Sequence, residues 1–231
     1  MSDPLRIALV AEGVTEREVI EAALTAILSP RRFVLTQLQP EATKPEMGMG
    51  WGGVLKWCRQ LAARAQLGGG AVESDATLSL FDGVVLHLDA DVATFAYGNL
   101  GASAHDDAQA LGWRALPCAT PCPPAPIPVD ALFSVLLSWL IPLAPGPRTV
   151  VCIPAMNTGA WQAAAKLAEG HALLSDLECR TDIETQLQQL PLALRVDKKK
   201  RESRLRAAAA VTTNWPTVTG ICSRASAFDQ D

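Results

Sequence analysis

The chain has 231 residues, of which 49% are hydrophobic and 19% are charged, and its formal net charge is −4 at pH 7. This composition is typical of a globular protein and excludes global disorder, while the acidic total excludes a uniformly basic surface that coats nucleic acid. The first residues lack a basic leader with an apolar segment, and the longest apolar stretch, 131–143, is too short to cross a bilayer, so we expect a cytoplasmic protein without membrane segments.

The first part of the chain predicts strands that alternate with helices. Residues 6–11 form a short apolar run typical of a strand buried on both faces, and Thr15 and Glu18 predict a capping box at the start of the next helix. A second strand is predicted at 33–38, a helix at 54–66, and the most strand-like run at 83–88. Such alternation predicts βαβ units and a mostly parallel sheet.

The second part of the chain predicts a helical end. Residues 92–128 are rich in Gly, Ala and Pro and predict a loop or insertion. A helix at 129–141, a strand at 148–153 and a helix from Asn157 or Thr158 to about 167 follow, and then two or three helices after His171. We predict one α/β domain over 1–170 and a helical C-terminal extension over 171–231 that packs on it. The six cysteines are scattered, and we expect reduced thiols.

Two pairs of acidic residues follow two of the predicted strands. Glu12 and Glu16 lie across the turn after the first strand, and Asp89 and Asp91 follow the strand at 83–88. In an open α/β sheet ligands bind beyond the carboxyl ends of the strands, so acids from two strands can converge there. Converging carboxylates are typical ligands of Mg²⁺ or Mn²⁺, and such a cation commonly meets phosphate.

A purely structural interpretation fits the two glutamates better than the two aspartates. Glu16 fits a residue that only complements the positive end of a helix, with Glu12 in a solvated turn. Strand alternation would place Asp89 and Asp91 on one side, where two like charges are unfavourable without a cation, so a functional role is favoured for them. His87 would share that side, but a lone histidine in an apolar strand is more often a hydrogen-bonded core residue than a ligand.

A basic stretch lies near the C-terminal end. Residues 195–206 contain seven basic and two acidic residues, which fits either a solvated helix face or a surface that binds a phosphate backbone. Under the second alternative, one of these lysines or Lys166 would also stabilise charge on a scissile phosphate. The candidate nucleic-acid-binding residues are Lys198, Lys199, Lys200, Arg201 and Arg204.

The strand that leads through Glu12-Gly-Val-Thr-Glu16 into a helix, and the later strand that ends in Asp89-Ala-Asp91, resemble the Toprim domain. The likeness is closest to the small stand-alone relatives of OLD-type (overcoming lysogenization defect) nucleases, and it runs from about residue 6 to 167, because the segment 153–161 also resembles theirs. The resemblance implies a Rossmann-like Toprim fold with Glu12 in acid–base chemistry or metal binding, Asp89 and Asp91 holding Mg²⁺, and Glu16 as a second metal-binding glutamate. Where those relatives tend to have a further acid, this chain has Gly159, which implies an incomplete metal position.

The residues and the resemblance together predict a Mg²⁺- or Mn²⁺-dependent nuclease that acts on DNA or RNA in phage defence or DNA repair, with an ATPase as a candidate partner. A first alternative, which Gly159 favours, is a catalytically degenerate Toprim-like protein that binds nucleic acid or a partner without turnover. A second alternative is a phosphatase of the haloacid-dehalogenase type with Asp89 as nucleophile. In that class, however, the aspartate strand normally opens the domain, and the Glu12 motif would go unexplained.

Overall fold

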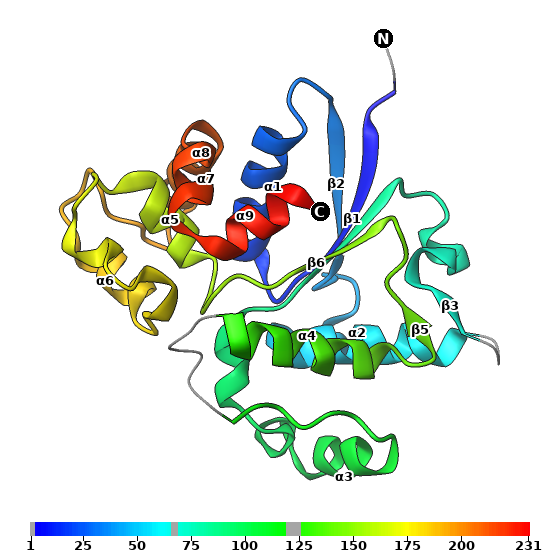
Figure 1. The fold of residues 1–231 in the computed structure, drawn as a ribbon. Coiled ribbons are helices and arrows are strands. Elements are labelled where there is room, and N and C mark those ends of the chain that lie inside the picture. The colour runs from blue at the N-terminus through cyan, green and yellow to red at the C-terminus, as the bar shows by residue number, and fades with distance from the viewer. Residues whose placement is uncertain (1–2, 66–68, 119–125) are drawn as a thin grey trace.

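A central parallel sheet with helices on both faces organises the chain (Figure 1). The computed structural model describes residues 3–65, 69–118 and 126–231. The main sheet has the order β2–β1–β4–β6, and all of its neighbours pair in parallel. Its strands are β1 (Leu5–Val10), β2 (Phe33–Gln39), β4 (Gly83–His87) and β6 (Thr149–Cys152), so the predictions of four strands and a mostly parallel sheet are confirmed. This arrangement is compatible with a Rossmann-like fold.

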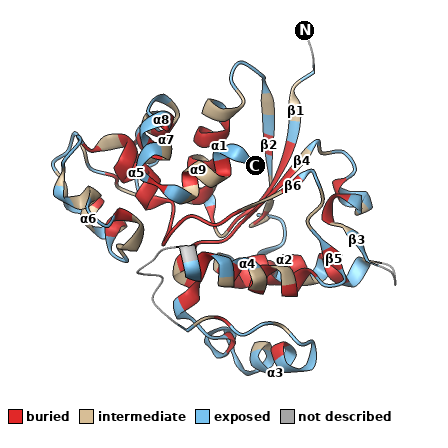
Figure 2. Ribbon diagram, in the orientation of Figure 1, coloured by how far each residue is buried: buried red, intermediate tan, exposed pale blue. Residues whose placement is uncertain are grey.

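The two faces of the sheet bury separate hydrophobic clusters. Along β1, Ile7 and Leu9 enter one cluster while Ala8 and Val10 enter the other, as the alternation of side chains along a strand requires. A strand covered on both faces has to be apolar throughout, which explains its continuous apolar run. The buried residues accordingly concentrate in the sheet and in the helix faces turned toward it (Figure 2).

One face of the sheet carries α1 and the helices of the C-terminal part of the chain. These helices contribute residues to one hydrophobic cluster, in which Trp161 stacks on Phe228 and meets Trp215 edge to face. They are α1 (Val14–Ile27), α5 (Gly159–Lys166), α6 (Ile183–Gln189), α7 (Arg201–Thr213), α8 (Trp215–Ile221) and α9 (Ser223–Gln230).

The other face is covered by α2 (Gly50–Arg64) and α4 (Pro126–Leu140), whose buried side chains include Leu61, Leu132 and Trp139. Beyond them lies α3 (Ala102–Ala110), at the bottom of Figure 1. A second, small parallel sheet pairs β3 (Gly70–Ala71) with β5 (Leu143–Ala144). The predicted insertion at 92–128 therefore contains a helix, and residues 119–125 of it lie outside the described residues.

The predicted capping box of Thr15 and Glu18 is wrong. Helix α1 begins at Val14 with Gly13 as its N-cap, and no side chain caps it.

The expectation of reduced cysteines is confirmed in part. Cys58, Cys118, Cys152 and Cys222 are free, but Cys179 is disulfide-bonded, and Cys122 lies outside the described residues. None of the helices in the described ranges is long and apolar enough to cross a membrane.

Candidate functional site

Glu12 and Asp89 meet beyond the carboxyl ends of two adjacent strands. β1 and β4 pair in parallel with Val10 opposite Leu86, so the residues that follow both strands emerge at one edge of the sheet. There the backbone N–H of Asp89 donates a hydrogen bond of 2.8 Å to Oε1 of Glu12. The structure thus brings these two predicted site residues into direct contact.

Asp91 reaches the same region by a different route from the one predicted. β4 ends at His87, and Asp91 lies in the first turn of a short 3-10 helix, Ala90–Thr94, rather than on the strand. The prediction that strand alternation aligns it with Asp89 is therefore wrong. Its backbone N–H donates to the carbonyl of Met156 at 2.9 Å, which ties this turn to the segment after β6.

Lys198 brings a positive charge from the C-terminal part of the chain into the acidic crevice. Its ammonium forms an ion pair with Glu184 and lies 4.0 Å from Oε1 of Glu16. The crevice is a hollow of about 490 Å³, and besides Glu12, Glu16, Asp89 and Lys198 its walls include Gly13, Val14, Thr15, Met49, Gly50 and Arg204. Three of the four predicted acids therefore line one hollow together with two basic residues.

Gly13 allows Glu16 to lie in this crevice. Gly13 is extended, with a φ of −161°, so no unusual backbone angle requires a glycine there. A Cβ at this position would lie only 2.7 Å from the Glu16 carboxylate, which is tighter than any ordinary contact. The glycine therefore provides space for a carboxylate rather than freedom to bend.

Burial and neighbouring carboxylates raise the pKa values of three acids at this site. Burial, and then the neighbouring Asp89 carboxylate, raise the pKa of Glu12 from 4.5 to about 8. Burial, followed by Glu184, raises the pKa of Asp91 from 3.8 to about 6. Burial also raises the pKa of Asp89, with Glu16 and Asp91 adding to the shift. Perturbed carboxyl groups of this kind cluster at functional sites.

His87 does not neutralise Asp89. Its Nε2 atom lies 3.2 Å from Oδ1 of Asp89, but burial lowers the pKa of the imidazole below 6.5, so the ring is neutral at physiological pH. Among the described residues neither ring nitrogen nor Oδ1 of Asp89 has a hydrogen-bond partner. The expectation that His87 is a hydrogen-bonded core residue is correct about burial and wrong about hydrogen bonding.

The chemistry of the crevice suits a hard cation such as Mg²⁺. Its acidic groups are all carboxylates, which are the oxygen ligands that such a cation prefers, although Oδ1 of Asp89 points at the buried Nε2 of His87, 3.2 Å away. No three His, Cys, Asp or Glu side chains of the described ranges are already placed to share one ion. The donor set therefore fits such a cation in type, with the side chains not yet gathered around one point.

The five basic candidates divide into two groups. Lys198 and Arg204 are partly buried and line the crevice, and Arg204 forms an ion pair with Glu18. The other three, Lys199, Lys200 and Arg201, are exposed on the outside of the molecule. Only part of the basic stretch therefore faces the acids, and the other part is exposed to solvent, with Lys200 3.8 Å from the carboxylate of Asp197.

Glu184 is a site residue that the sequence did not reveal. It lies in α6, within the part after His171 where two or three helices are predicted, but its neighbours carry no motif that singles it out. Only the packing of α6 against α5 turns it toward Lys198. No signal in the sequence by itself could have identified it.

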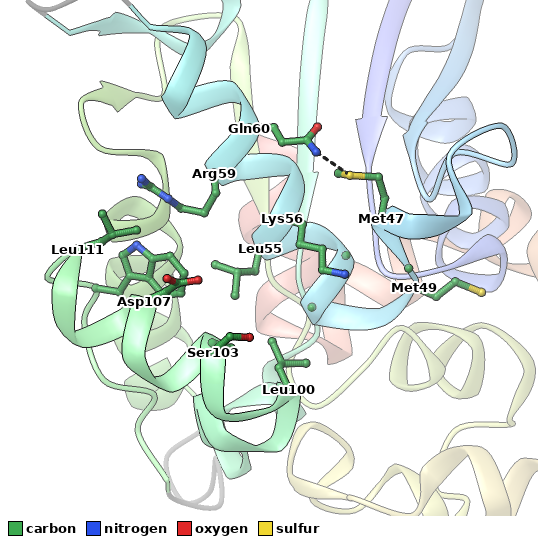
Figure 3. A pocket seen from close by; sticks show the side chains of 15 residues that line it. Met47, Met49, Leu55, Lys56, Arg59, Gln60, Leu100, Ser103, Asp107 and Leu111 are labelled. Carbon is green, nitrogen blue, oxygen red and sulfur yellow. Dashed lines mark hydrogen bonds between the residues drawn. The ribbon is translucent and has the colours of Figure 1, made fainter.

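A second cavity lies beside the crevice, between α2 and α3 (Figure 3). It has a volume of about 550 Å³ and shares Met49 with the crevice wall. Its polar groups are largely engaged: Lys56 donates to the carbonyl of Glu46, and Gln60 donates to the sulfur of Met47. This cavity is more apolar than the crevice and holds none of the predicted site residues.

The fold and the site define an α/β protein with an acidic crevice at the carboxyl edge of a parallel sheet. Comparison with protein-family models, curated proteins and solved structures gives no match for this chain. Its function is therefore argued from the residues of the crevice.

Proposed function

We propose that this protein is a metal-dependent phosphodiesterase that cleaves DNA or RNA, of the Toprim type that its motifs resemble. The observation that carries the proposal is the meeting of Glu12 and Asp89 from adjacent strand ends, in a crevice that Lys198 and Arg204 also line. Carboxylates and basic side chains in one crevice are the groups that phosphoryl chemistry requires: ligands for a cation, and positive charge for a phosphate.

Each acid has a role that its surroundings support. Asp89 and Asp91, with Glu16, would hold Mg²⁺ or Mn²⁺, which when bound polarises a phosphate oxygen and lowers the pKa of water. Glu12 would act as a further metal ligand or in proton transfer: without metal, burial and the Asp89 carboxylate raise its pKa to about 8, and a bound cation would lower that pKa again. Its hydrogen bond from the Asp89 N–H fixes its position at the strand edge.

The basic residues have two separate roles in this proposal. Lys198, in the crevice, is placed to stabilise negative charge that develops on a phosphate. Lys199, Lys200 and Arg201, on the exposed side of the same segment, would bind the sugar–phosphate backbone without reading its sequence. The same short segment would in this way position a polyanion and contribute to its cleavage.

The test is cleavage of labelled DNA and RNA, single- and double-stranded, with Mg²⁺ or Mn²⁺ and with EDTA. We expect metal-dependent cleavage by the native protein and its loss in an Asp89→Ala, Asp91→Ala double variant. A matched control replaces the exposed Asp106 and Asp130 by alanine and should cleave normally. Circular dichroism melts show whether each variant is folded. Undiminished cleavage by the Asp89, Asp91 variant would overturn the proposal.

A second candidate function is nucleic-acid or partner binding without turnover. It is favoured by the ammonium of Lys198, which already supplies a cation between Glu16 and Glu184. The same experiment separates the two functions, because this candidate predicts retention of nucleic acid in a binding assay with no cleavage under any metal. A phosphatase with Asp89 as nucleophile predicts instead release of phosphate from small phosphomonoesters and a covalent adduct on Asp89.

A further inference from the structure

The cavity between α2 and α3 adjoins the acidic crevice at the start of α2. Met49 lies in the walls of both hollows, and a Cβ built on Gly13 in the crevice wall would lie 3.8 Å from Cε of Met49. The next residue, Gly50, donates a backbone hydrogen bond of 2.8 Å to the carbonyl of Glu12. Because a methionine side chain is unbranched and adaptable, the side chain at this boundary is able to adjust to a ligand that occupies both hollows.

The cavity has an apolar rim that the protein leaves exposed. This rim consists of Met49, Leu100 and Leu111, which are 67%, 39% and 53% exposed and line the cavity from different segments (Figure 3). Single exposed apolar side chains are ordinary, but three around one cavity of about 550 Å³ indicate a binding site for a ligand with apolar or aromatic faces.

The cavity also contains polar groups that are available to a ligand. Ser103 and Asp107 line it from α3, and in the described part of the chain neither side chain has a hydrogen bond or an ion pair. Lys56 lines it from α2, and its ammonium, which has three protons to donate, gives one to the carbonyl of Glu46 at 3.1 Å. Hydrogen-bond donors and an acceptor beside an apolar rim match a flat heterocycle, which has apolar faces and a polar edge.

The crevice lies between this cavity and the basic stretch. Arg204 lies in α7, which packs on the same face of the sheet as α1, whereas α2 covers the other face. Arg204 and Met49 nevertheless line the same crevice. A strand with a phosphate in the crevice would therefore have basic side chains on one side for its backbone and the cavity on the other side for a base.

We propose that the cavity between α2 and α3 binds one unpaired nucleobase of the strand whose phosphate lies in the crevice, so that the substrate is single-stranded at this point. The proposal rests on the function proposed above. The apolar rim would contact the faces of the base, and Lys56, Ser103 and Asp107 would meet its polar edge. A base in a duplex is stacked and paired and enters a pocket only after it leaves the stack, whereas a base in a single strand is free to enter.

The direct test compares a short labelled thymidine strand with the same strand without bases, which keeps every phosphate. Fluorescence anisotropy in EDTA measures the affinity of the native protein for both without cleavage. We expect removal of the bases to weaken binding about tenfold, as is usual for the loss of a base that contacts a protein surface. We also expect a duplex that contains the same strand to bind more weakly than the single strand.

A pair of matched variants assigns this difference to the cavity. Ser103→Leu narrows the cavity from an exposed position of α3, while Ala102→Leu adds the same side chain to the same helix at an exposed position that does not line the cavity. We expect Ser103→Leu to lose most of the difference between the two strands and Ala102→Leu to keep it. Leu111→Ala, which removes part of the rim, should also reduce the difference, and Leu192→Ala, exposed elsewhere, should not.

The outcomes distinguish this proposal from the one on which it rests. Equal affinity for the strands with and without bases would overturn the nucleobase site and leave a different apolar ligand or partner for the cavity, while metal-dependent cleavage, measured separately, decides the proposed function. Equal base dependence in Ser103→Leu and Ala102→Leu would also overturn the nucleobase site. If the native protein neither binds nor cleaves nucleic acid, both proposals fall. Thermal melts establish folding, and if Ser103→Leu fails to fold, Leu111→Ala and Leu192→Ala decide.

Discussion

The guanidinium of Arg204 binds the carboxylate of Glu18 at two points, with Nε 2.8 Å from Oε2 and Nη2 3.2 Å from Oε1. A third nitrogen of Arg204, Nη1, donates to the backbone carbonyl of Lys198 at 2.8 Å. One side chain therefore joins α7 to α1 and holds the segment that carries the crevice lysine. The position of Lys198 depends on this arrangement.

We expect Arg204→Lys to lower the free energy of unfolding by about 1–2 kcal/mol, because lysine cannot form a two-point bond and the pair is largely shielded from solvent. Cleavage should fall as well, since Lys198 loses the contact that holds its backbone. Urea unfolding and a cleavage assay measure the two effects. Arg206→Lys, at an exposed position of the same helix, is the control and should change neither. Native stability in Arg204→Lys would contradict this account.

The exposed basic residues should affect binding and leave stability alone. We expect Lys199→Ala, Lys200→Ala to weaken nucleic-acid binding at low salt and to reduce the slope of log K against log salt concentration by about 1.5, since each phosphate contact contributes roughly 0.7–0.9. The double variant Arg31→Ala, Arg32→Ala removes two exposed charges just before β2, at the amino-terminal ends of the strands, and should leave the slope unchanged. Equal slopes in the two variants would remove the basic segment from the binding surface. Fluorescence anisotropy at several salt concentrations measures the slopes.

Glu12→Gln should separate stability from activity. The glutamine oxygen can still accept the hydrogen bond from the Asp89 N–H, and removing a buried acid beside Asp89 relieves an unfavourable interaction. We therefore expect the melting temperature of the metal-free protein to stay the same or rise, while cleavage falls by about 100-fold or more through loss of the proton-transfer group. A variant that cleaves normally would exclude Glu12 from the chemistry. Melting in EDTA and cleavage in Mg²⁺ provide the two readouts.

We expect Glu73 to make the free energy of unfolding fall as the pH drops below about 4.5. This buried carboxylate accepts hydrogen bonds from the N–H groups of Gly146 and Arg148 and from the hydroxyl of Thr149, at 2.5–3.1 Å. Burial acts to raise its pKa, but these hydrogen bonds outweigh burial and hold the pKa below the ordinary 4.5. Its stabilisation is therefore fully present above about pH 4.5 and is lost as the pH falls through the lower folded value.

Glu73→Gln should accordingly lower the free energy of unfolding by about 2 kcal/mol at neutral pH, since an amide offers one acceptor oxygen where the carboxylate offers two. The difference from the native protein should narrow as the pH falls below 4.5. Urea unfolding at pH 7 and at several values below 4.5 gives the comparison. A difference that stays constant with pH would show that the charge of Glu73 contributes nothing.

Much of the fold could be predicted because its strands are covered on both faces. Such strands must be apolar at every position, so β1 and β4 appear in the sequence as uninterrupted runs, and the acids that follow them mark the ends. The contact between Glu12 and Asp89 follows from parallel pairing alone. The start of α1 could not be found in this way, because its N-cap is Gly13, which has no side chain to form a capping hydrogen bond.

The rest of the site depends on packing between distant segments. Asp91 lies in a 3-10 helix that begins after β4 has ended, so the alternation of side chains along a strand does not predict its position. Glu184 enters the crevice region only because α6 packs against α5 beside Gly159, a contact between residues with no shared pattern in the sequence. Local patterns predict strand ends, and they do not predict which face of a remote helix turns toward them.

The ion pair between Glu18 in α1 and Arg204 in α7 can form only after the C-terminal helices have been synthesised. The strands that precede Glu12 and Asp89 leave the ribosome well before Lys198 and Arg204 do. Until the last helices dock, the nascent crevice contains carboxylates without the lysine that pairs with them. Docking of the C-terminal helices is thus the step that adds the positive charge of Lys198 to a crevice that is otherwise acidic.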